Sequence, residues 1–460
     1  MPVGADEFAF LKKLHGDLSD RPLEPNSPFY VPIHERNLQD DPVSHMAATI
    51  AFQDVESIQL FSGFRGAGKT TQLFRLKQHL EAQGYLVLYA NALDYLNPGE
   101  PVDITDLLIV LAAAFGETLS KRLKADVMGE TFWDRLKNFL TRTEVKLTSA
   151  GANAALETPL GGFFGKLKAG MDLKFEIKTA STFRHTMQAV LANQLSDFEG
   201  QVVSFIEDSI KRVRADRGDD TKVVFLFDQL EQLRGGILTE QSVIASVGRI
   251  FTLHFDRLRL PYVHVVYTVP PWLKFVVPGM VELTLLPTPH IWNNDSDRTV
   301  TRSNWDMFRA VALKRLGEAG IARLFGTDPV ESERLIDQMI GMSGGHLRDL
   351  LRLLRETALR AVSLDALPVP AGLVAGAVNA VRREFLPIAQ NDAVWLARIA
   401  NVRATALPDT EAVSVNRLSR FLDSHFVLYF VNDEEWYDIH PLIRDEVAKV
   451  VAATPSVPEG

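Results

Sequence analysis

The sequence predicts an α/β protein, in which a parallel sheet flanked by helices is followed by two smaller units that are mainly helical. Between residues 46 and 290, short apolar runs bounded by turn residues alternate with amphipathic helical stretches, as in strand–helix–strand units. The first apolar run ends in a glycine-rich turn, and open α/β sheets bind ligands at such strand ends. Beyond residue 300 the helical period dominates, and one strand pair occurs near the C-terminus.

Length and composition fit a globular protein of several domains. A chain of 460 residues is too long for one ordinary core, so we expect two or three domains. Hydrophobic residues make up 46% and charged residues 23% of the chain, as in soluble globular proteins. The expected parts are an N-terminal helix with a proline-rich lead-in at 1–45, the α/β core at 46–290, a helical lid at 301–363 and a third unit at 371–453.

Charge and cysteine content exclude some classes of protein. The net charge of −9 argues against a protein that coats nucleic acid, although a local basic face stays open. The absence of cysteine excludes disulfides and thiolate metal sites and is compatible with a reducing cytoplasm. The N-terminal residues lack the basic start and apolar core of a secretory signal, and no apolar run approaches roughly 18 residues. We therefore expect a cytoplasmic protein without a membrane span.

The stretch 58–71, IQLFSGFRGAGKTT, fits the pattern of a phosphate-binding loop. A predicted strand at 57–62 precedes it and an amphipathic helix at 70–83 follows it, which is the context that such a loop requires. The fixed positions of the pattern G-x-x-x-x-G-K-S/T are all filled, by Gly63, Gly68, Lys69 and Thr70.

Bare main chain in this loop would let successive N–H groups and the N-terminus of the following helix point at a polyphosphate. We expect Lys69 to reach the terminal phosphates and Thr70 to hold Mg²⁺. The residues expected to contact the nucleotide are Gly63, Phe64, Arg65, Gly66, Ala67, Gly68, Lys69, Thr70 and Thr71.

Four further apolar runs complete the predicted sheet. Strands separated by helices at this spacing imply right-handed crossovers and parallel pairing. Helices are expected at about 104–123 and 183–214, and the strands at 85–90, 222–228, 262–268 and 281–286.

Residues 142–180 interrupt this pattern. The stretch 166–178, KLKAGMDLKFEIK, alternates apolar and polar residues, which predicts a half-exposed strand of a β insertion, one arm of a hairpin around 159–162. Such an insertion is either a solvated flap or a surface for a partner or another protomer.

Asp228 ends the apolar run that begins at residue 223. A carboxylate at the end of a buried strand, paired with a phosphate-binding loop, forms the second half of a site that hydrolyses nucleotides, and Asp228 would bind Mg²⁺ through water. We expect Glu231 to polarise the attacking water and Gln229 to orient it; the alternative is a Glu231 on the surface and slow hydrolysis. Thr268 would end the neighbouring strand, within reach of the terminal phosphate or the water.

The run GMSGGHLRDLLRLL predicts a helix break at Gly344 and Gly345 and a new helix that opens with His346, Leu347 and Arg348. An arginine in the first turn of a helix is unfavourable for the helix dipole. That placement makes sense if Arg348 faces a γ-phosphate, and the alternative is a solvated arginine beside Asp349.

Residues 371–453 predict three helices, a strand pair and a final helix near Pro441, which is the order of a winged helix. In versions that bind DNA the recognition helix is basic. Here the stretch 415–424 offers Arg417 and Arg420 against Asp423, and the predicted wing is acidic, which repels phosphate. DNA readout is possible but not favoured, and a packing domain is the simpler interpretation.

Together these motifs resemble the AAA+ and STAND-type branch of the P-loop ATPases, whose P-loop NTPase core is followed by a helical lid, with a winged helix in initiator-like members. The resemblance covers residues 30–363 and rests on the two Walker motifs GFRGAGKTT and VVFLFDQLEQ, on Thr268 and on SGGHLRDLLRLL. It implies a bound ATP or ADP with Mg²⁺ on Thr70 and Asp228, sensed by Thr268 and Arg348.

The resemblance also gives a role to a histidine near the C-terminus. In some STAND switches a histidine of the winged helix touches the bound nucleoside diphosphate and locks the closed state. The segment DIHPLIRDEV is similar, which makes His440 the corresponding residue; an ordinary buried histidine is the alternative.

One departure from the family pattern bears on the rate. Ring-forming AAA+ enzymes carry an arginine finger before the last strand, whereas the interval 269–280 contains Lys274 and no arginine. A finger contributes several orders of magnitude in rate where it exists. Its absence favours a slow, switch-like ATPase over a ring motor.

We therefore expect an ATP-binding and slowly ATP-hydrolysing regulatory switch that acts through a protein partner or self-assembly. Two alternatives stay open: a nucleic-acid-associated AAA+ ATPase, such as a loader or a regulator of transposition or repair, and a non-catalytic nucleotide-binding scaffold. Bacteria use such ATPases in phage defence, transcription and DNA metabolism, and the fold alone does not choose among them.

Overall fold

The computed structural model describes residues 4–35, 41–123, 131–149, 172–192, 194–236, 238–276, 282–405, 412–432 and 434–453. The chain divides into two compact units. One, the sheet unit, comprises Met46–Ser62 and Leu76–Thr284; the other, the loop unit, comprises Met1–His45, Gly63–Arg75 and Leu285–Gly460.

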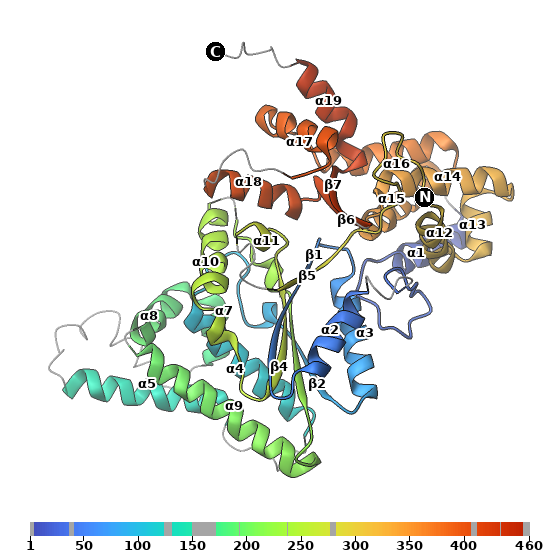
Figure 1. Cartoon of the computed structure of the whole chain (residues 1–460). Coiled ribbons are helices and arrows are strands. Elements are labelled where there is room, and N and C mark those ends of the chain that lie inside the picture. Colours follow the sequence, from blue (N-terminus) through green and yellow to red (C-terminus); the bar gives the residue numbers. More distant parts are fainter. Residues whose placement is uncertain are drawn as a thin grey trace, which may run out of the picture. The chain divides into compact units, whose positions relative to one another are not determined.

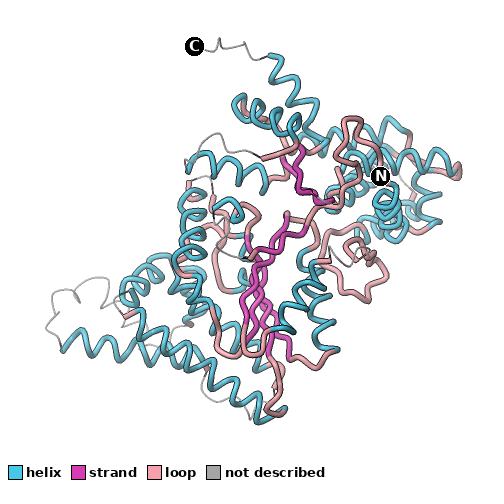
Figure 2. Tube along the Cα trace, in the orientation of Figure 1, coloured by secondary structure: helices cyan, strands magenta, loops and turns pink. Residues whose placement is uncertain are grey.

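A five-stranded sheet with the order β2-β3-β4-β1-β5 forms the centre of the α/β part (Figures 1 and 2). The pairs β1 with β4, β4 with β3, and β3 with β2 are all parallel. Every residue of β3 and β4 is buried, so both faces of the sheet are covered, which is why these strands are almost continuously apolar. The predicted α/β fold is confirmed, with β1 (Ser57–Gly63), β2 (Leu86–Asn91), β3 (Val223–Asp228), β4 (Val263–Val269) and β5 (Leu283–Leu286).

Helix α4 (Ile104–Ser120) is the most apolar helix of the sheet unit and packs against β2 and α9. It begins where Asp103 and Asp106 form a capping box, which satisfies free N–H groups of the first turn. Among the described residues, the other helices of this part of the chain are α2 (Pro42–Phe52), α3 (Lys69–Ala82), α5 (Phe132–Ser149), α7 (Leu173–Thr179), α8 (Ser181–Ala192), α9 (Leu195–Arg217), α10 (Glu240–Leu253) and α11 (Leu273–Val276).

The β-strand predicted at 166–178 is wrong for the residues that the structure describes. Leu173–Thr179 form the helix α7, capped by the Asp172 carboxylate, which accepts a hydrogen bond from the Phe175 N–H. Leu173 and Ile177 lie four residues apart and are both buried, whereas Phe175 is 61% exposed. A short alternating run thus also satisfies the helical spacing. The turn predicted at 159–162 lies outside the described residues.

The single helix predicted at 183–214 is also wrong, because the chain forms two helices there. Helix α8 ends at Ala192 and α9 begins at Leu195, after Gln194. The apolar period continues across this junction, so the sequence pattern did not reveal the break.

The loop unit is mainly helical. Helix α1 (Ala5–Asp17) packs against α12 and α15 of the predicted lid. The lid comprises α12 (Arg302–Leu316), α13 (Glu318–Phe325), α14 (Pro329–Ser343) and α15 (Leu347–Leu364). The C-terminal part comprises α16 (Ala371–Arg383), α17 (Gln390–Val402), α18 (Ala412–Asp423), the antiparallel pair β6 (Val427–Asn432) and β7 (Glu434–Ile439), and α19 (Arg444–Ala453).

The elements expected of the third unit are thus present, and their arrangement as a winged helix stays a prediction. Among the helices in the described ranges, none combines the length and the apolar character needed to cross a membrane.

Candidate functional site

Residues 63–71, called here the loop 63–71, comprise the last residue of β1, a tight turn at 64–68 and the first turn of α3. Gly66 and Gly68 have φ angles of +88° and +99°, in the left-handed region that favours glycine. The Ala67 N–H donates to the Phe64 carbonyl at 3.1 Å, which closes the turn. Helix α3 begins at Lys69, so its N-terminal amides follow the loop directly, as in anion-binding loops.

The Lys69 side chain turns back across this loop. It is 5% exposed, and its Nζ donates to the carbonyls of Gly63 and Phe64 at 2.8 and 3.1 Å. The ammonium group is therefore held beside the main chain that would surround a phosphate. A phosphate is a stronger, charge-assisted partner than a neutral carbonyl, so the lysine is placed to exchange one for the other.

The two threonines of the loop have different surroundings. Thr70 lies half-buried in the first turn of α3. The Thr71 hydroxyl accepts a hydrogen bond from the Leu23 N–H at 3.1 Å, which ties the proline-rich lead-in to the loop.

Arg348, in the first turn of α15, lies directly against Gly66. A methyl group added to Gly66 would come within 2.6, 2.8 and 2.9 Å of the Cβ, Nε and Cδ atoms of Arg348. The Arg348 Nε is 2.8 Å from a carboxylate oxygen of Asp20, which follows α1. The arginine predicted to face the phosphates thus lies over the loop, paired with an acid that the sequence did not suggest.

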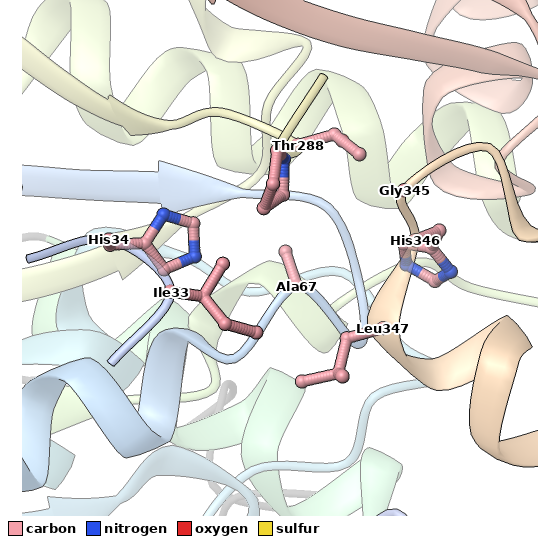
Figure 3. A pocket seen from close by; sticks show the side chains of 8 residues that line it. Ile33, His34, Ala67, Thr288, Gly345, His346 and Leu347 are labelled. Atoms are coloured by element: carbon pink, nitrogen blue, oxygen red, sulfur yellow. The ribbon is translucent and has the colours of Figure 1, made fainter. Parts of the chain in front are cut away.

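A small cavity lies beside the loop (Figure 3). In the figure the Ala67 methyl group lies between Ile33 and His34 on one side and His346 and Leu347 on the other. Its volume of about 10 Å³ accommodates roughly one water molecule, so a purine base would enter only if these segments moved apart. The lining residues are Ile33, His34, Ala67, Thr288, Pro289, Gly345, His346 and Leu347.

Two residues of the proline-rich lead-in, His34 and Phe29, differ in their relation to this cavity, because only His34 lines it. Burial and the charge of Arg75 lower the pKa of His34 to about 4, so its ring is neutral near pH 7. Phe29 is not among the residues that line the cavity, and the Arg315 guanidinium lies over its ring at 4.9 Å.

In the sheet unit, Asp228 ends β3 and is fully buried. One carboxylate oxygen accepts a hydrogen bond from the Tyr89 hydroxyl at 2.9 Å, and the other accepts from the Gln229 N–H at 2.8 Å. Burial and the charge of Asp228 raise the pKa of Tyr89, which keeps the phenol protonated as a donor. The adjacent strand β2 therefore supplies a group that orients the carboxylate.

A second set of hydrogen bonds joins Asp228 to the predicted catalytic residues. Gln229 has a φ angle of +71°, and its N–H also donates to the Thr268 hydroxyl at 2.6 Å. The Thr268 hydroxyl in turn donates to a Glu231 carboxylate oxygen at 2.8 Å. Glu231 is 6% exposed, so it is not the surface residue of the alternative interpretation. The Gln229 side chain accepts from Gln232 at 3.2 Å.

His440 follows β7 and is fully buried. Its Nδ1 accepts from the Leu442 N–H at 3.2 Å, its ring stacks on Phe385, and its Nε2 lies 3.3 Å from a carboxylate oxygen of Asp349. The predicted contact of His440 with a nucleotide stays a prediction.

The sequence interpretation missed the cluster around Asp349. His346 and Asp349 lie three residues apart at the start of α15, and this spacing places both side chains on one helix face. The sequence could have indicated this pair. His425 and His440 come from distant positions in the sequence, and no local pattern links them to α15.

No protein-family model matches the sequence, and a comparison with curated proteins gives no match either. Similar solved structures include the Walker-type ATPase of Pyrococcus abyssi, at 12% identity over 95% of this chain and 99% of that chain, with a TM-score of 0.38. The ORC2 protein of Aeropyrum pernix, in its ADPNP-ADP complexes, is 10% identical over 95% of this chain and 96% of that chain, with a TM-score of 0.41.

The Aeropyrum pernix ORC1 protein in complex with DNA is 15% identical over 91% of this chain and 92% of that chain, with a TM-score of 0.33. These identities and TM-scores are low, so the similarities establish neither a family nor an activity for this chain.

Proposed function

We propose that this protein binds ATP and ADP with Mg²⁺ and hydrolyses ATP slowly, as a regulatory switch of the AAA+ and STAND type. The observation that carries the proposal is the loop 63–71, whose left-handed glycines lead into α3 while Lys69 lies across its own main chain. Bare amides, a helix N-terminus and one ammonium group are what a polyphosphate requires.

The oxygen donors that we propose for Mg²⁺ suit this ion, which prefers hard oxygen ligands and keeps several waters. Thr70 lies in the first turn of α3, and Asp228 is the last residue of β3. The two Asp228 oxygens accept hydrogen bonds from the Tyr89 hydroxyl and the Gln229 N–H, which orient the carboxylate. When bound, the ion would neutralise charge on the phosphates.

The sheet topology supports the pairing of these two halves. Strand β4 lies between β1 and β3, and all three run parallel, so their carboxyl ends share one edge of the sheet. Phe61 pairs with Thr268, and Phe227 pairs with Tyr267. The chain therefore leaves β1 and β3 at the same edge of the sheet.

Glu231 is the group that we propose activates the attacking water. Its carboxylate is buried and fixed by the Thr268 hydroxyl, which suits a base that must be held in one orientation. Gln229 contributes its main-chain N–H, which holds Asp228 and Thr268 together. Because residues 269–280 supply no arginine, turnover is slow.

The nucleic-acid alternative receives no support from the predicted recognition helix. Arg417 and Arg420 of α18 pair with Asp392 at 3.4 and 3.0 Å. Cations that are neutralised within the protein contribute little to phosphate binding. We propose that output passes instead through a protein partner or through self-assembly.

Steady-state ATP turnover and ADP titrations of four variants test the proposal. Lys69→Ala should abolish nucleotide binding, and Asp228→Asn should abolish Mg²⁺-dependent turnover. Glu231→Gln should keep binding and lose turnover. Lys77→Ala removes another lysine of α3, which pairs with Glu81 on the surface, and should behave as wild type. Equal nucleotide affinity of Lys69→Ala and wild type would refute the proposal.

A further inference from the structure

Asp349, a buried carboxylate of the loop unit, is surrounded by three histidine rings and one arginine side chain. One of its oxygens, Oδ2, lies 2.6 Å from His346 Nδ1, 3.3 Å from His440 Nε2 and 3.7 Å from His425 Nδ1. The other oxygen, Oδ1, accepts from Arg352 at 2.7 Å. Asp349, His346 and His440 are fully buried, so solvent does not screen the electrostatic interactions between them.

His346 connects this cluster to the phosphate-binding loop. Its Nε2 faces the Arg65 carbonyl at 2.9 Å, while its Nδ1 faces the Asp349 carboxylate. A carbonyl only accepts. Burial opposes ionisation of Asp349, but the neighbouring His346 ring and the hydrogen bonds from the histidines hold the pKa of this carboxyl well below its usual range. Since acceptors face both ring nitrogens, we expect the His346 ring to donate at both ends, as the imidazolium form does.

The direction of the Arg65 carbonyl determines the direction of a loop amide. In a planar trans peptide the C=O and the next N–H point to opposite sides. Because His346 Nε2 faces the Arg65 carbonyl, the Gly66 N–H of the same peptide points to the side away from His346. That amide is one of the donors that a bound phosphate would use.

The ends of the β6–β7 strand pair complete the cluster. His425 precedes β6 and His440 follows β7. Since His440 Nδ1 accepts from the Leu442 N–H, its proton lies on Nε2, the nitrogen nearest Asp349. The His425 ring packs on the His346 ring with 4.2 Å between centroids.

A metal ion is the other possible organiser of this cluster. Donor atoms of His346, Asp349 and His425 lie within 4.8 Å of one another. However, a metal would have to displace the His346 proton that faces Asp349, and it would add two charges beside Arg352 in a buried site. That accumulation of positive charge is costly, so the hydrogen-bonded arrangement is favoured.

We propose that His346 is a positioning residue for nucleotide binding, held by Asp349, and that the β6–β7 strand pair controls nucleotide affinity through this contact. The proposal rests on the proposed function of loop 63–71. When His440 and His425 hold Asp349, the loop amide is pre-organised for phosphate. When the strand pair withdraws, His346 is released and the nucleotide is bound more weakly.

The test compares ADP affinity, by calorimetry of the full chain with Mg²⁺, in two matched variants. Asp349→Asn removes the charge that holds His346 and should weaken ADP binding roughly 10-fold, the loss of one charge-assisted contact. Asp392→Asn removes another buried, arginine-paired aspartate of the loop unit, which lies in α17 outside the strand pair, and ADP affinity should stay unchanged. Equal effects of the two variants, or no effect of Asp349→Asn, would overturn the proposal.

A double-mutant cycle tests the route through the strand pair. His440→Phe should weaken ADP binding in the wild-type background and have no further effect when His346→Gln is already present, because both changes break the same connection. Additive effects would overturn the proposal. Treatment with a chelator, followed by Mg²⁺, should leave affinity unchanged; a loss that Zn²⁺ restores would identify a metal site instead.

A measurement without nucleotide separates failure of this inference from failure of the proposed function. In protein with isotope-labelled histidine, the NMR signal that disappears in His346→Gln should show protons on both ring nitrogens. A singly protonated His346 overturns the positioning role even if ADP binds. A doubly protonated ring in a protein that binds no nucleotide refutes only the proposed function.

Discussion

Replacing Gly66 by alanine should separate two effects, backbone strain and displacement of Arg348. The φ angle of +88° costs an L-residue about 1–2 kcal/mol of folding stability. In addition, the new methyl group would lie 2.6 Å from Arg348 Cβ, so the arginine must leave its place over the loop. Loss of one hydrogen bond to a charged group corresponds to roughly 10- to 100-fold weaker nucleotide binding.

Gly84→Ala is the matched control for this prediction. Gly84 has a φ angle of +89°, and a methyl group there meets nothing within 4 Å. Urea unfolding should show a similar loss of stability in both variants, whereas ADP titration should show weaker binding only in Gly66→Ala. Arg348→Ala should reproduce that weaker binding, and adding Gly66→Ala to it should change affinity little. The reasoning is refuted if Gly66→Ala and Gly84→Ala bind ADP equally well.

Two further predictions concern buried groups. Burial lowers the pKa of His264 to about 4, and burial with the charge of His346 lowers that of His425 to about 3. Below about pH 6.5 these histidines are protonated in the unfolded chain but stay neutral in the folded protein. The free energy of unfolding should therefore fall with falling pH by up to about 1.4 kcal/mol per pH unit for each ring. Urea unfolding between pH 7 and pH 5 measures this, and a flat profile would contradict it. Tyr89→Phe removes the hydroxyl that orients Asp228 and should change the Mg²⁺ dependence of ATP turnover at a stability cost of about 1 kcal/mol; an unchanged Mg²⁺ titration would count against the role of this hydrogen bond.

The strands of the sheet were predictable because a strand that is buried on both faces is a nearly continuous apolar run in the sequence. Strands β3 and β4 are mostly apolar; the polar Asp228 ends β3, and Thr268 is the residue before the last of β4. The loop 63–71 could also be predicted from the sequence, because its backbone angles require glycine at positions where other residues rarely adopt them. Local chemistry was sufficient in both cases.

The errors arose where local pattern is ambiguous or where tertiary contacts decide. The run that forms α7 places Leu173 and Ile177 on one face in a helix as well as in a strand. The cluster around Asp349 depends on His425 and His440, whose approach to α15 is set by packing rather than by any local motif. The helix-dipole argument singled out Arg348, which lies against Gly66; its phosphate contact stays a prediction, and its pairing with Asp20 depends on the path of the N-terminal segment.

The most direct measurement is a calorimetric titration of ATP and ADP, with Mg²⁺, into the full chain and into Lys69→Ala. The account predicts saturable binding at one site per chain for the wild type and none for the variant, in which the ammonium group over the loop is missing. Absence of binding to the wild type, or binding of equal strength to both proteins, would contradict it.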